Sequence, residues 1–131
     1  EITAASLLLA LREGCAATGS DVLLDLGSGS GRAALAAGAA AGVAHVGGLE
    51  LLPSLVALSQ AAAARAREAA PDGWGGAARR ALFLEGDILL TPWWEGVPAR
   101  TADASTAARL LPTIVYLAAT KWKELMGQLS A

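Results

Sequence analysis

The chain of 131 residues has few of the side chains that build covalent cross-links or metal sites. A single cysteine, Cys15, excludes an internal disulfide framework and is compatible with a reducing compartment. The single histidine, His45, has no cysteine, histidine or paired acid at metal-ligand spacing, so we expect it to have a structural or surface role. The sequence therefore predicts no metal site.

Long apolar runs and an excess of one charge are also lacking. No apolar stretch approaches the roughly 18 residues of a membrane-spanning helix, and no signal peptide is visible. We therefore expect no membrane segment and an intracellular location, in either the nucleus or the cytoplasm. The net charge of −2 and the isoelectric point near 5.3 argue against a broad phosphate-binding face. Because Glu1 stands where an initiator methionine would, the chain is expected to begin inside a longer protein.

What the chain has in quantity is alanine and short apolar runs. Hydrophobic residues make up 54% of the sequence and charged residues 17%, which predicts one folded, helix-rich domain over residues 1–131. Apolar runs predict strands at residues 22–26, 43–49, 81–84 and 113–117, and helical spacing predicts helices at about 2–17, 32–41, 53–70 and 120–129. This alternation predicts an α/β fold, a Rossmann-like parallel sheet with helices on both faces. Residues 97–111 form a polar, alanine-rich insert.

A glycine-rich turn follows the first predicted strand and opens the next helix. Its sequence is Asp25-Leu26-Gly27-Ser28-Gly29-Ser30-Gly31. Glycines at such a turn let a ligand lie against the main chain, and both dinucleotide and S-adenosylmethionine (SAM) sites use them. A dinucleotide site prefers a glycine at position 32, where Arg32 stands, and its pyrophosphate favours a free helix N-terminus. The spacing thus favours SAM, which has no phosphate.

Two further acids follow the next two predicted strands. Glu50 ends the second strand, where a carboxylate can accept both hydroxyls of a ribose, in SAM and NAD alike. Asp87 follows the third strand and Gly86, where it can accept from an adenine amino group. With Asp25, which is placed for the ammonium of a methionine moiety, three acids stand at the carboxyl ends of three successive strands. This coincidence is the strongest sequence indication of a SAM site.

These three features resemble class I SAM-dependent methyltransferases over roughly residues 20–90. A closer similarity is to the disruptor-of-telomeric-silencing family, the histone lysine methyltransferases without a SET domain. Asp25-Leu26-Gly27-Ser28-Gly29 resembles that family's glycine motif and Glu1-Ile2-Thr3 resembles the end of its Tyr-Gly-Glu loop. Gly48-Leu49-Glu50, Glu85-Gly86-Asp87-Ile88-Leu89, and Trp93 or Trp94 resemble its later motifs.

The fourth predicted strand departs from that family. The family places an asparagine near the cofactor there, whereas this chain has no asparagine and has Ala118 at the matching position. The resemblance leaves Tyr116 and Trp122 as walls of a lysine channel. No Asn/Asp-Pro-Pro-aromatic run and no Pro-Cys pair follows this strand, which excludes amino-methylating enzymes of nucleic acids and cytosine-5 methyltransferases. A class I methyltransferase would also continue for about three more strands.

The sequence thus predicts a SAM-dependent methyltransferase acting on a protein lysine, with a histone or nucleosome as its partner and no direct nucleic-acid motif. Two alternatives remain: a SAM-binding or interaction remnant without catalysis, and a methyltransferase for another protein or a small molecule. An NAD(P)-dependent oxidoreductase would need a catalytic Tyr-Lys or His arrangement that the sequence lacks. The residues expected to contact the cofactor are Glu1, Asp25, Gly27, Ser28, Gly29, Gly31, Arg32, Glu50, Asp87 and Ile88.

Overall fold

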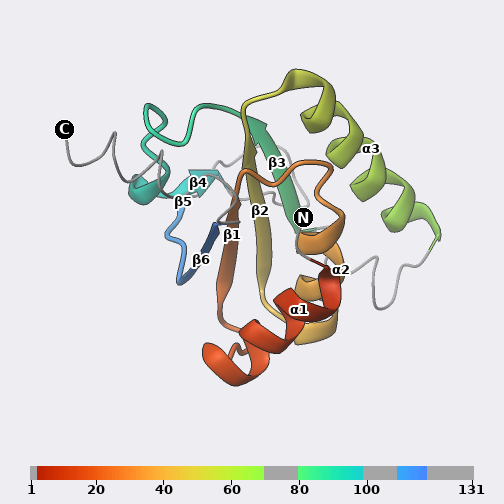
Figure 1. Cartoon of the computed structure of the whole chain (residues 1–131), viewed down its shortest axis with the longest axis vertical. Coiled ribbons are helices and arrows are strands. Elements are labelled where there is room, and N and C mark those ends of the chain that lie inside the picture. The colour runs from red at the N-terminus through yellow and green to blue at the C-terminus, as the bar shows by residue number, and fades with distance from the viewer. Residues whose placement is uncertain (1–2, 70–79, 99–108, 118–131) are drawn as a thin grey trace.

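Helices and parallel strands alternate along the chain. The computed structural model describes residues 3–69, 80–98 and 109–117 (Figure 1). Its elements are α1 (Ala4–Leu9), a π-helical segment (Ala10–Gly14), β1 (Val22–Leu26), α2 (Arg32–Ala41), β2 (His45–Glu50), α3 (Pro53–Ala69), β3 (Ala81–Glu85), a 3-10 turn (Trp93–Glu95), β4 (Val97–Pro98), β5 (Arg109–Leu110) and β6 (Ile114–Leu117). The predicted bounds of β1 and α2 are confirmed to the residue, and the predicted final helix, 120–129, lies outside the described residues.

The ends of α2 show why the sequence prediction succeeded. Gly31 precedes the helix and Gly42 follows it, and both adopt a left-handed conformation with φ of 71°. Glycine reaches this conformation without the strain that a Cβ brings, so these two positions stop the alanine-rich helix at both ends. The first helix is shorter than predicted, because α1 passes into a π-helical segment in which the Cys15 amide bonds the Ala10 carbonyl.

The four longer strands form one parallel sheet in the order β3-β2-β1-β6. The chain builds outward from β1 to β3 and then returns to place β6 on the other side of β1. This return creates a switch point between β1 and β6, and ligands of such sheets bind beyond the carboxyl ends of the strands at that point. Asp25 is paired in register with Gly48 of β2 and with Tyr116 of β6, so it lies at this switch point.

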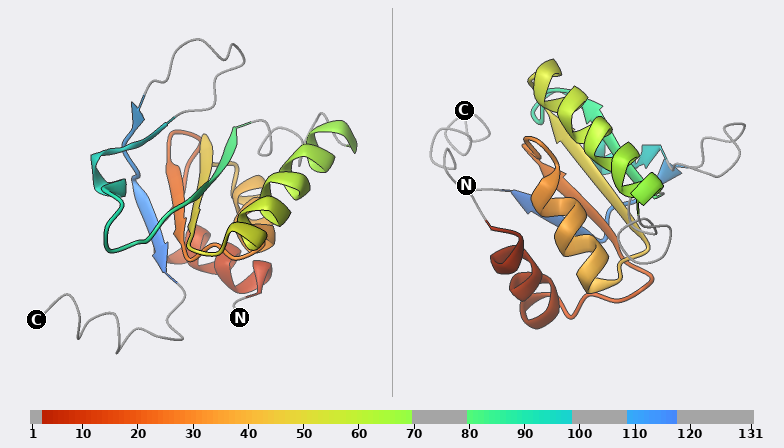
Figure 2. Two further views of the ribbon diagram at one scale, coloured as in Figure 1. Left: turned by 90° about the horizontal axis from the view of Figure 1, so that it is seen from above. Right: turned by 90° about the vertical axis from the view of Figure 1, so that its right-hand side faces the viewer.

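In the described part of the chain, α1, α2 and α3 all lie on one face of the sheet (Figure 2). Leu7 and Leu11 from the first helical stretch, together with Leu35 of α2, pack there against Leu23 and Phe83 of the sheet. The opposite face is covered by the segment after β3, where Ile88 and Trp93 pack against a cluster of Leu24, Leu26 and Leu49. The prediction of a Rossmann-like parallel sheet is confirmed, and among the described residues the layer on its far face is this loop segment.

The insert predicted at residues 97–111 has structure at both of its ends. β4 and β5 pair antiparallel, with Val97 opposite Leu110 and Pro98 opposite Arg109. The Arg109 guanidinium donates to the Gly96 carbonyl at 2.9 Å, which fastens the base of this ribbon. The two ends of the polar, alanine-rich insert therefore form a short antiparallel ribbon, which the sequence did not indicate. Among the described helices, none combines the length and apolarity that crossing a membrane requires.

The packing of α2 on β2 gives a first test of the fold. A Cβ at Gly38 of α2 would overlap the Val46 side chain of β2, whereas a Cβ at Gly14 would meet nothing within 4 Å. We expect Gly38→Ala to destabilise the chain by about 1–3 kcal/mol, because overpacking outweighs the better helix propensity of alanine. Gly14→Ala serves as the control and should leave stability unchanged or slightly raised. Urea unfolding midpoints measure both, and an unchanged midpoint for Gly38→Ala would contradict this packing.

Candidate functional site

The candidate site is the edge of the sheet at which the four parallel strands end. Asp25 is the fourth residue of β1 and Glu50 is the last residue of β2. Asp87 follows β3 by two residues. Because the strands are parallel and in register, the three predicted acids lie at the same edge, as the sequence indicated.

The glycine loop is tied to the end of β2. The amides of Gly27 and Ser28 both donate to the Leu49 carbonyl, at 2.8 and 3.1 Å. Gly27 and Gly29 have φ of 76° and 55°, and a Cβ built on either would meet nothing within 4 Å. The main chain at these two glycines therefore faces open space, and a ligand can lie directly against it.

At Gly31 a side chain is excluded by close packing. A Cβ there would lie 2.7 Å from the Phe83 ring and 2.8 Å from Cβ of Ser59. The residue is buried and lets the start of α2 pack closely against β3 and α3. Its predicted contact with a cofactor stays a prediction, and the structure gives it a packing role that the sequence did not indicate.

Glu50 holds the glycine loop in place. Its Oε2 accepts from the Gly29 amide at 2.9 Å and its Oε1 accepts from the Leu52 amide at 3.0 Å. Each carboxylate oxygen can accept a second hydrogen bond, so the group can bind a ligand hydroxyl while it keeps both amides. Sequence reasoning had placed this acid at the loop but had not found that it fastens the loop itself.

Asp25 is buried without a full set of partners. Its side chain is 4% exposed, and its Oδ1 has no hydrogen bond within the described residues. Burial, and secondly the charge of Glu50, raise the pKa of Asp25 to about 7. An unpartnered buried carboxylate is costly, so this position favours a ligand that supplies a positive charge or a donor.

Asp87 and Ile88 belong to a tight turn after β3. Asp87 Oδ1 accepts from the Leu89 amide at 2.8 Å, which fixes the carboxylate, and its Oδ2 makes no hydrogen bond within the described residues. Gly86 is required beside it, because a Cβ there would lie 2.5 Å from Oγ1 of Thr91. Ile88 packs against the leucines of the far face of the sheet.

The other predicted site residues are placed as follows. Ser28 Oγ is buried without a partner, next to Gly48, where a Cβ would approach it to 2.6 Å. Arg32 is exposed in the first turn of α2, and Tyr116 of β6 is half-buried beside Asp25, against the helix-side core. Glu1 and Trp122 lie outside the described residues.

Sequence reasoning missed two leucines at this edge. Leu51 and Leu52 directly follow Glu50 and are 60% and 53% exposed. Exposed leucines beside an acid that can bind a ribose offer an apolar surface to a flat ring. The signal in the sequence was the pair of leucines between Glu50 and the proline that begins α3.

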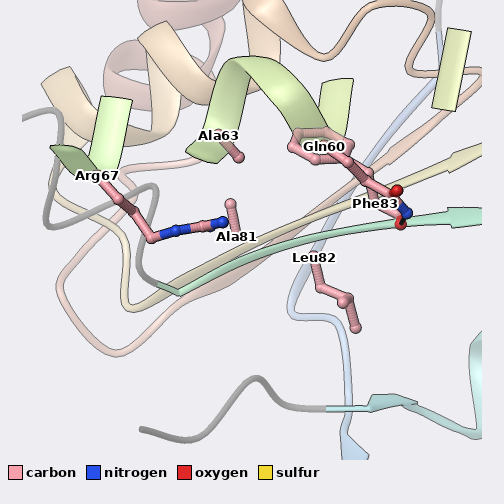
Figure 3. A pocket seen from close by; sticks show the side chains of 6 residues that line it. All are labelled: Gln60, Ala63, Arg67, Ala81, Leu82 and Phe83. Atoms are coloured by element: carbon pink, nitrogen blue, oxygen red, sulfur yellow. Dashed lines mark hydrogen bonds between the residues drawn. The ribbon is translucent and has the colours of Figure 1, made fainter. Parts of the chain in front are cut away.

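An open pocket of about 220 Å³ lies elsewhere, between α3 and β3 (Figure 3). Gln60, Ala63 and Arg67 of α3 face Ala81 and Phe83 of β3 there. The Gln60 side-chain amide donates to the Phe83 carbonyl at 3.0 Å. None of the strand-end acids lines this pocket, so it is separate from the candidate site.

The chain is similar to solved structures of methyltransferases. The chain superposes with a TM-score of 0.62 on an RNA methyltransferase from Salinibacter ruber in complex with S-adenosyl-L-homocysteine (SAH), at 24% identity, covering 95% of this chain and 65% of that one. Methyltransferases from Geobacter sulfurreducens and Thiobacillus denitrificans, both in complex with SAH, match at 27% and 26% identity with TM-scores of 0.46 and 0.45.

The first of these comparisons shows that the chain shares the Rossmann-like fold of that methyltransferase. This chain spans 65% of the length of the Salinibacter ruber protein and under a third of the other two. The chain matches no protein-family model and no curated relative. The closer resemblance to the disruptor-of-telomeric-silencing family is not supported by these comparisons.

The burial of Asp25 makes a prediction about stability in the absence of any ligand. The folded state binds the Asp25 proton more tightly than the unfolded chain, so the contribution of Asp25 to wild-type stability falls as the pH rises from about 4 through 7. Asp25→Asn removes this loss. We expect the advantage of Asp25→Asn over wild type to grow by about 2–3 kcal/mol between pH 5 and pH 8, measured by urea unfolding at each pH.

Asp21 provides a control with the opposite sign. Hydrogen bonds from the Thr18 amide and then the Thr113 and Thr18 hydroxyls lower the pKa of Asp21. Asp21→Asn should therefore destabilise the chain at pH 8. An Asp25→Asn variant that is no more stable than wild type at pH 8 would show that Asp25 is not held unpartnered.

Proposed function

We propose that the carboxyl edge of this sheet binds SAM and that the chain is the cofactor-binding part of a SAM-dependent methyltransferase. The observation that carries the proposal is Asp25, a buried acid with an unpartnered oxygen at the switch point of the sheet. Open main chain at Gly27 and Gly29 lies in the loop that follows it. A ligand with an ammonium group and a flat ribonucleoside without phosphate fits this combination.

Each part of the cofactor has a proposed partner among the described residues. Asp25 takes the ammonium, Glu50 accepts the ribose hydroxyls, and Oδ2 of Asp87 accepts from the adenine amino group. Leu51 and Ile88 offer apolar surface to the adenine ring. The residues also proposed to line the cofactor are Ser28, Gly31, Arg32 and Glu1.

When bound, SAM supplies an electrophilic methyl group on a sulfonium. Asp25, Glu50 and Asp87 are assigned to holding the cofactor, so the described residues of the site are proposed to act by positioning. Glu50 fixes the loop through the Gly29 amide and so fixes the surface on which the methyl donor lies. Tyr116, beside Asp25, is proposed as one wall of the path to the methyl group, with Trp122 as another.

For the methyl acceptor we propose a protein lysine, supported by the resemblance of the loop Asp25–Gly29 and of the residues after β3 to histone lysine methyltransferases. RNA is a second candidate, because the Salinibacter ruber protein that shares the fold over 95% of this chain is an RNA methyltransferase. The two candidates differ in the charge and size of the surface that the acceptor needs, and experiment separates them directly.

Cofactor binding is the first test. We expect SAH to bind the chain in isothermal titration calorimetry and NADH not to bind. Glu50→Ala should weaken SAH binding about 10- to 100-fold, because it removes charge-assisted hydrogen bonds to the ligand and frees the glycine loop. Glu13→Ala removes the same charge from an exposed position in the π-helical segment and should leave binding unchanged. Binding of NADH in place of SAH would contradict the proposal.

Transfer of a tritiated methyl group from SAM tests the acceptor, with the protein incubated with nucleosomes, free histones or total RNA. We expect label in protein that survives nuclease and is lost with protease. Label that nuclease removes would assign RNA as the acceptor. SAH binding without label in any acceptor would support the binding remnant and contradict the enzyme.

A further inference from the structure

The described residues place no positive charge beside Asp25. The neighbouring strands offer Gly48 of β2 and Tyr116 of β6 as its register partners. Burial, and then the nearby Asp25, raise the pKa of Tyr116 above its ordinary value, so the phenol is neutral at physiological pH. The helix α1 has no titratable residue, and the first turn of α2 carries only the exposed Arg32.

A second acid, Glu50, lies at the same edge, and its charge disfavours ionisation of Asp25. Glu50 accepts two backbone amides, at 2.9 and 3.0 Å, which stabilise a carboxylate. Oδ1 of Asp25 accepts no hydrogen bond from the residues that the structure describes. Asp87 adds a further acid after β3. Burial first and the charge of Glu50 second favour the protonated form of Asp25, and no described donor to Oδ1 offsets them.

We propose that Asp25 is largely protonated in the free protein below neutral pH and that the ammonium of the cofactor ionises it, so that binding releases a proton. On binding, the carboxyl group of Asp25 loses its proton to the solvent, and the resulting carboxylate forms an ion pair with the ammonium of the cofactor. This inference rests on the proposed SAM site and adds a pH dependence to it.

The pKa of Asp25 determines how strongly ligand affinity should depend on pH. Burial and the charge of Glu50 raise the pKa of Asp25 to about 7, so the competent carboxylate is scarce at pH 6 and prevalent at pH 8. The affinity for a ligand with an ammonium group should therefore be about tenfold higher at pH 8 than at pH 6. The number of protons released per ligand should fall from about 0.9 at pH 6 to about 0.1 at pH 8.

Calorimetry of SAH binding tests this inference, with titrations at pH 6, 7 and 8 in buffers of small and large ionisation enthalpy. The difference in apparent enthalpy between buffers gives the number of protons released. Methylthioadenosine is the matched ligand, because it keeps the adenosine and lacks the ammonium. It should bind without proton release and with the same affinity at all three pH values.

Asp25→Asn is the matched protein variant. It should bind SAH more weakly than wild type, without proton release and with one affinity across the pH range. Proton release that persists in Asp25→Asn would assign the proton to another group and overturn the inference. SAH binding by wild type without proton release and with equal affinity at pH 6 and pH 8 would overturn it as well. Absence of SAH binding at every pH would instead overturn the proposed SAM site, and the inference with it.

Discussion

The attachment of the glycine loop to the end of β2 is the constraint on which the candidate site depends. Two loop amides bond the Leu49 carbonyl, and a third, from Gly29, bonds the Glu50 carboxylate. These bonds hold the loop beside the open edge of the sheet with its main chain facing outward. They also bring the Glu50 carboxylate close to Asp25, whose pKa is raised first by burial and then by the charge of Glu50.

The two acids of this edge consequently have different properties. Glu50 is satisfied by the main chain and acts as part of the scaffold. Asp25 is buried, and its Oδ1 has no hydrogen-bond partner among the described residues. In the free protein the ionised form of this carboxyl is therefore unfavourable, at the position where we expect an ammonium group to bind. The burial of Asp25 thus favours the binding of a cation at this position.

Sequence reasoning located this site because its signals are local. Glycines at positions 31 and 42 mark both ends of α2, and each predicted acid follows a short apolar run that does form a strand. The sequence therefore indicated that Asp25 and Glu50 lie at one edge of the sheet, where the structure has them. Interactions between distant residues were not predictable in this way, since no periodicity encodes them. The packing of Gly31 against Phe83, the amides bound by Glu50 and the pairing of β4 with β5 are of this kind.

The most direct test is to measure the pKa of the Asp25 carboxyl in the free protein and in the complex with SAH. A carboxyl carbon-13 NMR titration of the free protein, assigned with Asp25→Asn, should show this carboxyl titrating near pH 7. Saturation with SAH should lower the midpoint by at least about two pH units, because an ammonium partner stabilises the carboxylate. A carboxyl that titrates near its ordinary value of 3.8, or one that SAH leaves unchanged, would contradict the account.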